Sequence, residues 1–274
     1  MLASQCVRFY RMFRSLAASV LSFAASMQAH GACTPVRFAY PDQDRPPYWL
    51  GNGSEVPNPP GASVELVREF TGSVGCPVAL LRLPVIRLRT ALQAGVADFT
   101  PADESSIGTP GVAFPLNANG EVDAKRAVPL VMVAFVRAAD KIDPAADPAA
   151  HFRGRTVGTT LGASYAVRMK QLGINIDSGG YGVVSNLEKL RLKRIDGFVV
   201  SLITETDMDR FVAERYRGQF VRLEKPLIRT NIWLAASKAY YDSHTAQVEA
   251  MWNWLGTAGN KRFTTLLKKY SDLP

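Results

Sequence analysis

The chain has 274 residues, 47% of them hydrophobic and 20% charged, a composition that excludes a disordered chain and supplies a globular core. Its formal charge of +8 is scattered along the sequence, without the basic stripe and interleaved aromatic residues of a nucleic-acid-binding surface. We therefore expect no nucleic acid among its partners. Past the first thirty residues, no stretch is long and apolar enough to suggest a membrane span.

The first 32 residues have the organisation of an export signal. Arg8, Arg11 and Arg14 precede a short apolar core at 16–25, and small residues follow it. A core shorter than the roughly twenty residues needed to span hydrocarbon is typical of a cleavable signal peptide rather than a membrane anchor. We therefore expect residues 1–32 to be removed on secretion to the periplasm. The excess of basic over acidic residues in the remainder slightly favours an anionic ligand.

Two cysteines remain once Cys6 leaves with the signal. Cys33 and Cys76 each stand just before a segment predicted as a strand, at 36–40 and 78–83. If these strands are parallel neighbours, their starts lie side by side and a disulfide becomes geometrically reasonable in an oxidising compartment. We predict a Cys33–Cys76 disulfide, with two free buried thiols as the alternative.

After Cys33 the sequence alternates between strand and helix patterns. Apolar residues recur at near-helical spacing over 64–74, and a second helical pattern at 85–94 ends at Gly95. Strands are predicted at 36–40, 78–83 and 97–100. Strands that alternate with helices through short connections pair in parallel, so we expect a βαβαβ unit.

A second alternation follows an irregular loop at 101–123. Its predicted elements are strands at 155–159, 196–201 and 219–223, a strand or loop at 178–184, and helices at 163–172, 185–193 (capped by Ser185) and 205–215. Two long apolar strands, 128–136 and 228–237, bracket it, and two helices close the chain. We therefore predict an α/β fold of two Rossmann-like lobes joined by two hinge strands, with lobe 1 at 33–136 plus 229–274 and lobe 2 inserted at 137–228.

No catalytic constellation stands out. The sequence has no Walker loop, no G-x-S-x-G elbow and no H-E-x-x-H, and its three histidines are far apart. We therefore predict a protein that is not an enzyme, with no catalytic residue, no metal site and no cofactor.

The features that remain are those that hold a ligand. Ligands of α/β sheets bind beyond the carboxyl ends of strands. Here those ends carry Tyr40, Thr100, Thr160 and Ser201. The turn at 160–165, with Gly162, Ser164 and Tyr165, would present backbone N–H groups and a hydroxyl to an anion, or would be an ordinary helix cap. Tyr48 and Trp49 would stack on a ligand or pack against lobe 1.

Four motifs in this order resemble the family 3 bacterial extracellular solute-binding proteins. They are P-P-Y at 46–48, L-P-x-x-R-x-x-x-x-L-x-x-G-x-x-D at 83–98, G-R-T-V-G-T-T-L-G-A-S-Y at 154–165 and R-I-D-G-F at 194–198. The resemblance covers nearly the whole chain after the signal. It implies a fold of the type II periplasmic binding protein kind, a small polar solute held between the lobes, and delivery to an ABC permease in the inner membrane by a monomer.

The sequence also departs from this family. Members that bind amino acids carry a T-x-E-R-like segment after the third strand, and its arginine pairs with the ligand carboxylate, whereas 103–109 contains Ser105 and no arginine. Ser201 stands where many members place an aspartate for the α-amino group. Arg126 is the candidate substitute for the missing guanidinium. We expect an amino acid or an organic acid as ligand.

Two other functions stay open at this point. One is a periplasmic enzyme of the dehydratase or lyase kind on the same fold, for which Glu104 or Glu205 would be the acid. The other is a degenerate clamp, which acts as a sensor or binds a partner protein and no solute.

Overall fold

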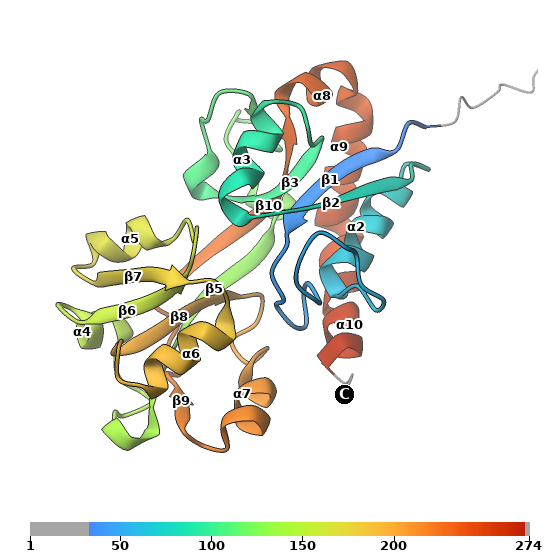
Figure 1. The fold of residues 1–274 in the computed structure, drawn as a ribbon. Helices are drawn as coiled ribbons and strands as arrows, with labels where there is room; N and C mark the ends of the chain where they lie inside the picture. The colour runs from blue at the N-terminus through green and yellow to red at the C-terminus, as the bar shows by residue number, and fades with distance from the viewer. Residues whose placement is uncertain (1–32, 272–274) are drawn as a thin grey trace, which may run out of the picture. The chain divides into compact units, whose positions relative to one another are not determined.

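The computed structural model describes residues 33–271, and the chain from Thr34 onward forms one compact unit (Figure 1). The predicted signal peptide, residues 1–32, lies outside the described residues. In residues 33–271 no helix combines the length and apolar character that crossing a membrane requires.

The first lobe begins with a parallel sheet. Its elements are β1 (Val36–Pro41), α2 (Ala62–Gly72), β2 (Val78–Leu83), α3 (Val85–Gln93), β3 (Phe99–Asp103), η1 (Glu104–Ser106), β4 (Val112–Ala113) and η2 (Ala124–Arg126). Strand β1 lies between β2 and β3 and pairs with both in parallel. Helix α3 packs on one face of this sheet, where Leu88 and Ala91 meet Ala39 of β1.

The second lobe repeats the parallel pattern. Its elements are β5 (Val128–Arg137), η3 (Ala138–Asp140), α4 (Pro148–Phe152), β6 (Thr156–Thr160), α5 (Ala166–Gln171), β7 (Asn175–Gly180), α6 (Val183–Arg191), β8 (Gly197–Leu202), α7 (Asp209–Tyr216) and β9 (Phe220–Arg222). Strand β6 pairs in parallel with β7 on one side and with β8 on the other.

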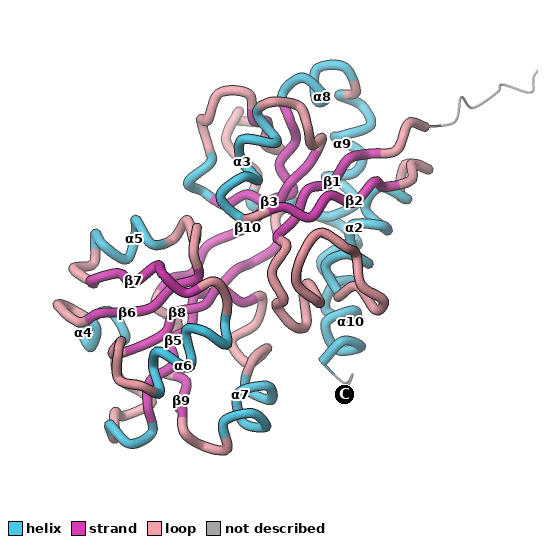
Figure 2. Tube along the Cα trace, viewed as in Figure 1, coloured by secondary structure: helices cyan, strands magenta, loops and turns pink. Residues whose placement is uncertain are grey.

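Two long strands connect the lobes, and Figure 2 shows both of them running from one group of strands to the other. Strand β10 (Ile228–Ser237) pairs with β5 at Ile228–Ile232, and then with β3 of the first lobe at 232–236. Strand β5 pairs with β10 over 128–132 and with β8 of the second lobe over 131–135. The predicted hinge strands are thus present, and the chain changes lobes near Met132. The predicted boundaries at 136 and 229 stay a proposal.

The closing helices return to the first lobe. They are α8 (Lys238–Ser243), α9 (Thr245–Trp254), a π-turn at η4 (Leu255–Gly259) and α10 (Asn260–Ser271). Trp252 of α9 is fully buried and meets Phe99 of β3 edge-on at 6.4 Å, while Phe70 of α2 meets the same ring at 5.2 Å. Edge-to-face pairs of this kind add to the stabilisation from burying the rings themselves.

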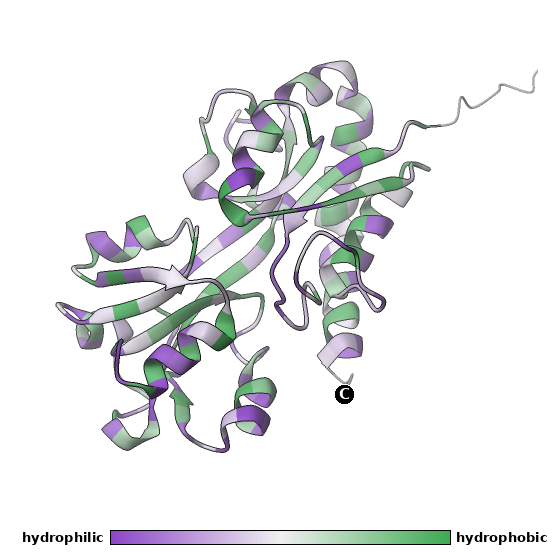
Figure 3. Cartoon of the chain, in the orientation of Figure 1, coloured by the Kyte–Doolittle hydropathy of each residue, from purple (hydrophilic) through white to green (hydrophobic). Residues whose placement is uncertain are grey.

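The second lobe has its own core, in which aliphatic and sulfur-containing side chains predominate. Met132, Val157, Met169 and Val199 are all buried there, together with Phe152. Figure 3 shows the hydrophobic residues concentrated along the strands of both lobes and the hydrophilic ones on the outer helix faces. Each lobe therefore buries an apolar interior of its own, as two units that hinge about connecting strands require.

Three local predictions need correction. The third strand begins at Phe99 and continues through Pro101 to Asp103, because β10 supplies an antiparallel partner for it. Helix α5 begins only at Ala166, three residues after the predicted start. The N-cap of α6 is Gly182, and Ser185 lies at its third position, where its hydroxyl accepts a hydrogen bond from the Gly182 N–H at 3.1 Å.

Both remaining cysteines are disulfide-bonded, as predicted. They precede β1 and β2, whose parallel register pairs Val36 with Val78.

Candidate functional site

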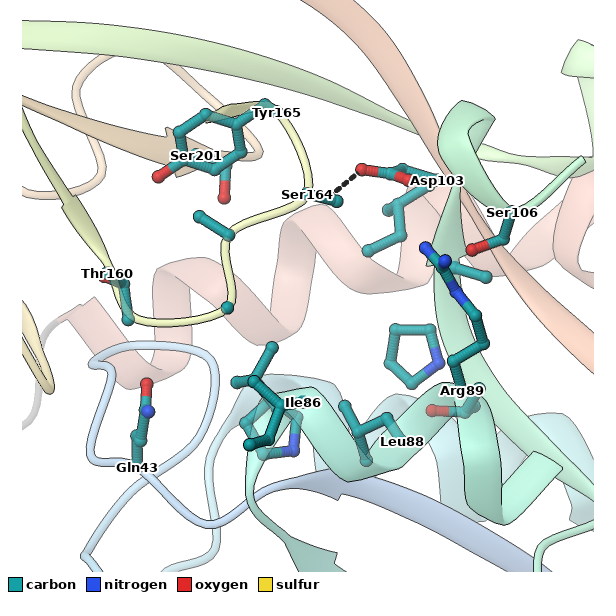
Figure 4. Close-up of a pocket in the computed structure, with 18 of the residues that line it drawn as sticks. Gln43, Ile86, Leu88, Arg89, Asp103, Ser106, Thr160, Ser164, Tyr165 and Ser201 are labelled. Atoms are coloured by element: carbon teal, nitrogen blue, oxygen red, sulfur yellow. Dashed lines mark hydrogen bonds between the residues drawn. The ribbon is translucent and has the colours of Figure 1, made fainter. Parts of the chain in front are cut away.

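A cleft of about 530 Å³ lies between the lobes, next to the hinge strands (Figure 4). Its walls include Gln43, Arg45 and Trp49 after β1, residues of α3 and the end of β3 from the first lobe, and the turn at 160–165 with the end of β8 from the second. The carboxyl ends of parallel strands from both lobes thus face one space, which is where α/β sheets bind ligands. The volume lies within the range of small-molecule sites.

Arg45 reaches across the cleft from the loop after β1. Its Nη2 donates a hydrogen bond to Oγ of Ser201 at 2.8 Å, and its guanidinium stacks on the ring of Tyr48 at 5.4 Å. Its Nε is buried with no hydrogen-bond partner among residues 33–271. No described carboxylate forms an ion pair with this guanidinium, so its positive charge is available to a ligand.

Arg89 of α3 brings a second guanidinium to the cleft. Its Nη2 donates to Oγ of Ser105 at 3.2 Å, and within the described part of the chain it has no ion pair. The side chain is exposed to solvent at the cleft wall.

Asp103, at the end of β3, is the acidic residue of the cleft lining. Its carboxylate accepts hydrogen bonds from the backbone N–H of Ser105 at 3.0 Å and from the Ser105 hydroxyl at 2.6 Å. A third hydrogen bond comes from the hydroxyl of Ser164, which crosses from the second lobe and is drawn in Figure 4. The carboxylate is therefore satisfied largely by neutral donors.

The turn at 160–165 faces the cleft, as predicted. Gly162 adopts a φ of +83°, and a Cβ placed there would lie 2.9 Å from Cγ2 of Ile86 in the first lobe. Glycine is therefore required both by the backbone and by the close approach of the lobes. Tyr165 donates its hydroxyl to the carbonyl of Val199 at 3.1 Å, and burial raises the pKa of Tyr165 to about 12.

Three further contacts join the lobes around the cleft. The hydroxyl of Tyr48 donates to the carboxylate of Asp207 and accepts from the N–H of Ile203 at 2.8 Å. Burial, with the adjacent Asp207 carboxylate, raises the pKa of Tyr48 well above its ordinary value. Tyr181 of the second lobe donates to Asp42 at 3.0 Å. The third contact is the ion pair of Arg168 with Glu104 at 3.6 Å.

The structure brings seven of the predicted ligand-binding residues together in the cleft lining. They are Trp49, Thr100, Thr160, Gly162, Ser164, Tyr165 and Ser201. The hydroxyl of Thr100 is buried without a partner among the described residues. Whether these residues contact a ligand stays a prediction.

Four predicted residues lie outside the lining. Tyr40 is buried, and its ring packs at a tilt of 33° against that of Trp49, with the ring centroids 5.1 Å apart. Tyr48 is buried in the contact between the lobes, and Ser105 is exposed, with its hydroxyl hydrogen-bonded to both Arg89 and Asp103.

Arg126 is not in the cleft, so it does not replace the missing arginine there. Its guanidinium is held inside the first lobe by Asp123 at 3.0 Å, by Glu249 at 2.5 Å and by the carbonyl of Leu116. These partners tie η2 to α9, which makes Arg126 a structural residue.

The lining residues that were not predicted from the sequence include Gln43, Arg45, Arg89 and Asp103. The first two lie in an irregular loop without periodicity, and Arg89 reads as one of several scattered surface arginines. Asp103 would have been found if the third strand had been extended past Pro101 to its true end.

The two acids considered for an enzyme do not line the cleft. Glu104 is exposed and pairs with Arg168, and Glu205 pairs with Arg229 at 2.5 Å. The site therefore offers oriented charges and hydroxyls to a ligand, and neither candidate acid is placed to act on one.

Solved structures of ligand-binding proteins are similar to the chain over most of its length. The GluR0 ligand-binding core from Nostoc punctiforme in complex with L-glutamate has a TM-score of 0.63 at 16% identity, over 87% of this chain and 100% of that one. A mutant of ArgBP from T. maritima has a TM-score of 0.61 at 17% identity, over 86% and 94% of the two chains.

The substrate binding protein of an amino acid ABC transporter has a TM-score of 0.56 at 16% identity, over 86% of this chain and 99% of that one. No family model matches the chain, and no curated protein matches its sequence. At such identities the likeness shows the fold. The chain has the predicted two-lobed α/β fold of the type II periplasmic binding protein kind.

Proposed function

We propose that this chain is a periplasmic solute-binding protein that captures a small polar solute, an amino acid or an organic acid, between its lobes for an ABC importer. The observation that carries the proposal is the cleft itself, about 530 Å³ in volume, with polar groups from both lobes at the hinge. Closing two lobes around a ligand buries most of its surface while the hinge strands absorb the rotation.

The similar structures support capture rather than chemistry. One is described with bound L-glutamate, and another as the substrate binding protein of an amino acid ABC transporter. In the proposed role the chain acts as a monomer in the periplasm after removal of 1–32, delivers the solute to a permease in the inner membrane, and leaves the solute chemically unchanged.

The first experiment is a ligand screen of the secreted chain, residues 33–274. The protein is unfolded and refolded to remove any ligand that copurifies, and its melting temperature is measured with amino acids, organic acids, polyamines and sugars. A ligand that binds only the folded state raises the melting temperature in proportion to the logarithm of its concentration over Kd.

Mass spectrometry of the ligand after incubation completes the test. We expect one class of small polar solute to stabilise the protein and to be recovered unchanged. A ligand recovered in chemically changed form would contradict the proposal and favour an enzyme. If no class of solute raises the melting temperature, the result would contradict the proposal and favour a clamp that binds a partner protein.

A further inference from the structure

The charged groups of the cleft indicate which kind of solute it takes. The lining contains two guanidinium groups, Arg45 and Arg89, and one carboxylate, Asp103. Neither arginine has a carboxylate partner among residues 33–271, whereas Asp103 already accepts three hydrogen bonds from Ser105 and Ser164. The cleft therefore presents two positive charges, at two places, that no described carboxylate neutralises.

The two guanidinium groups lie apart. Figure 4 shows Arg89 beside Ser106 on one side of the pocket, and Ser201 with Tyr165 on the opposite side. Because Nη2 of Arg45 is 2.8 Å from Oγ of Ser201, the Arg45 guanidinium lies on the Ser201 side. An elongated molecule with an anionic group at each end matches two positive charges on opposite sides of the pocket.

We propose that the cleft binds a linear dicarboxylate, with one carboxylate on Arg45 and the other on Arg89. This inference rests on the proposed function and narrows its solute class. A guanidinium pairs with a carboxylate through two parallel hydrogen bonds, which fixes the direction of the ligand as well as its charge. Ser201 is then a positioning residue that holds Arg45 in place from the other lobe.

Two sources share this chemistry, acidic amino acids and dicarboxylates without an amine. Asp103 can distinguish the two classes of ligand, because its carboxylate would attract the ammonium group of an amino acid and would gain nothing from the methylene that replaces it. Glutamate and glutarate have the same carbon backbone and differ in the amine alone, so their comparison separates the two sources.

The test is calorimetric titration of residues 33–274 with four matched ligands: glutamate, glutarate, glutamine and butyrate. We expect glutamate or glutarate to bind at least about tenfold more tightly than the ligand that lacks the second carboxylate, since a hydrogen bond to a charged group is worth roughly this factor or more. Preferential loss of glutamate binding in Asp103→Asn would identify the amino acid as the source. Glutarate that binds more tightly than glutamate, with an affinity that Asp103→Asn leaves unchanged or raises, would identify the amine-free acid.

Variants locate the two anchors. Arg89→Gln and Arg45→Gln should each weaken the dicarboxylate about tenfold or more, and each should also reduce the preference for glutarate over butyrate. Arg87→Gln is the matched control, because Arg87 is an exposed arginine of the same helix and does not line the cleft. It should bind as the unmodified chain does.

Two results would overturn the inference. Tighter binding of glutamine, arginine, a sugar or a phosphate monoester than of every dicarboxylate would refute the dicarboxylate class and leave the proposed capture function standing. Failure of every solute to bind would remove both proposals together. Circular dichroism and the melting temperature of each variant show whether a loss of binding comes from unfolding.

Discussion

All three charged side chains of the cleft lining, Arg45, Arg89 and Asp103, come from the first lobe, whereas the second lobe contributes the hydroxyls of Ser164 and Ser201. The first lobe is also the one that contains the disulfide-bonded Cys76 and the cluster of aromatic rings around Phe99. The second lobe has a core of methionine and aliphatic side chains.

This asymmetry suggests a division of work. The first lobe would select the ligand by charge, and the second would add hydroxyl groups on closure. The contacts that join the lobes are hydrogen bonds to the carboxylates of Asp42, Asp103 and Asp207 and one exposed ion pair. Each contributes at most about 3 kcal/mol, so closure stays reversible.

Replacing both Cys33 and Cys76 with serine should give the largest effect. Loss of the cross-link restores the loop-closure entropy of the unfolded chain, and we expect the free energy of unfolding to fall by about 4 kcal/mol. Urea titration measures the loss. Hydrogen exchange of the double variant should show a larger loss of protection in β1 and β2 than in β6 and β7. An equal loss of protection in both lobes would contradict the expectation that the disulfide stabilises the first lobe specifically.

Gly162→Ala should reduce ligand affinity by about tenfold. The alanine would be strained at a φ of +83°, by roughly 1–2 kcal/mol, and its Cβ would press on Ile86 of the first lobe, so the closed arrangement loses stability. Gly154→Ala is the control, because Gly154 has a φ of +74° with no atom within 4 Å of the added Cβ. It should lose similar stability and keep its affinity, and equal losses of affinity in both variants would contradict a role in closure.

Ser164→Ala should weaken ligand binding by on the order of 1 kcal/mol. It removes the hydroxyl that the second lobe donates to Asp103 across the cleft, which is a hydrogen bond to a partly exposed carboxylate. Calorimetry should give a loss smaller than that of Arg89→Gln. A larger loss would mean that the second lobe, and not the first, supplies the main recognition.

The smallest effect expected is on acid stability. In the first lobe, burial raises the pKa of Glu65, but hydrogen bonds from Lys269 at 2.8 Å and Tyr270 at 2.6 Å outweigh it and hold the pKa below its ordinary value of 4.5. In the second lobe, the hydrogen bond from Lys189 at 2.8 Å lowers the pKa of Asp177 below 3.8.

Each lowered pKa stabilises the folded state at pH values above the pKa of the unfolded chain, and this contribution is lost as the pH falls through the folded value. Glu65→Gln should therefore flatten the decline of stability below a pH of about 4.5, and Asp177→Asn should flatten it below about 3.8. Urea midpoints measured from pH 6 to pH 3 report both. A steeper decline in either variant would contradict the direction of the shift.

Much of the fold could be predicted from the sequence because its elements carry local patterns. Strand β10 has the predicted bounds, and β1, β2 and β5 differ from theirs by at most one residue. The long strands were recognisable as a pair because both are long and largely apolar, and most of their residues are buried. The turn at 160–165 was placed correctly because it follows a strand that must end at the ligand edge of its sheet.

The contents of the cleft were decided by tertiary structure. Arg45 and Arg126 look alike in the sequence, as single arginines in irregular segments. Among residues 33–271, the Arg45 guanidinium donates a hydrogen bond to Ser201 and lies over the ring of Tyr48, while the Arg126 guanidinium is enclosed by Asp123 and Glu249.

Periodicity records which face of an element is buried, so it determined the order of strands and helices in this protein and the two-lobed hinge that they form. The charge of a loop arginine is free or neutralised according to which distant carboxylates the folded chain brings beside it. That choice depends on contacts between residues far apart in the chain, and it decided where this protein presents positive charge to a solute.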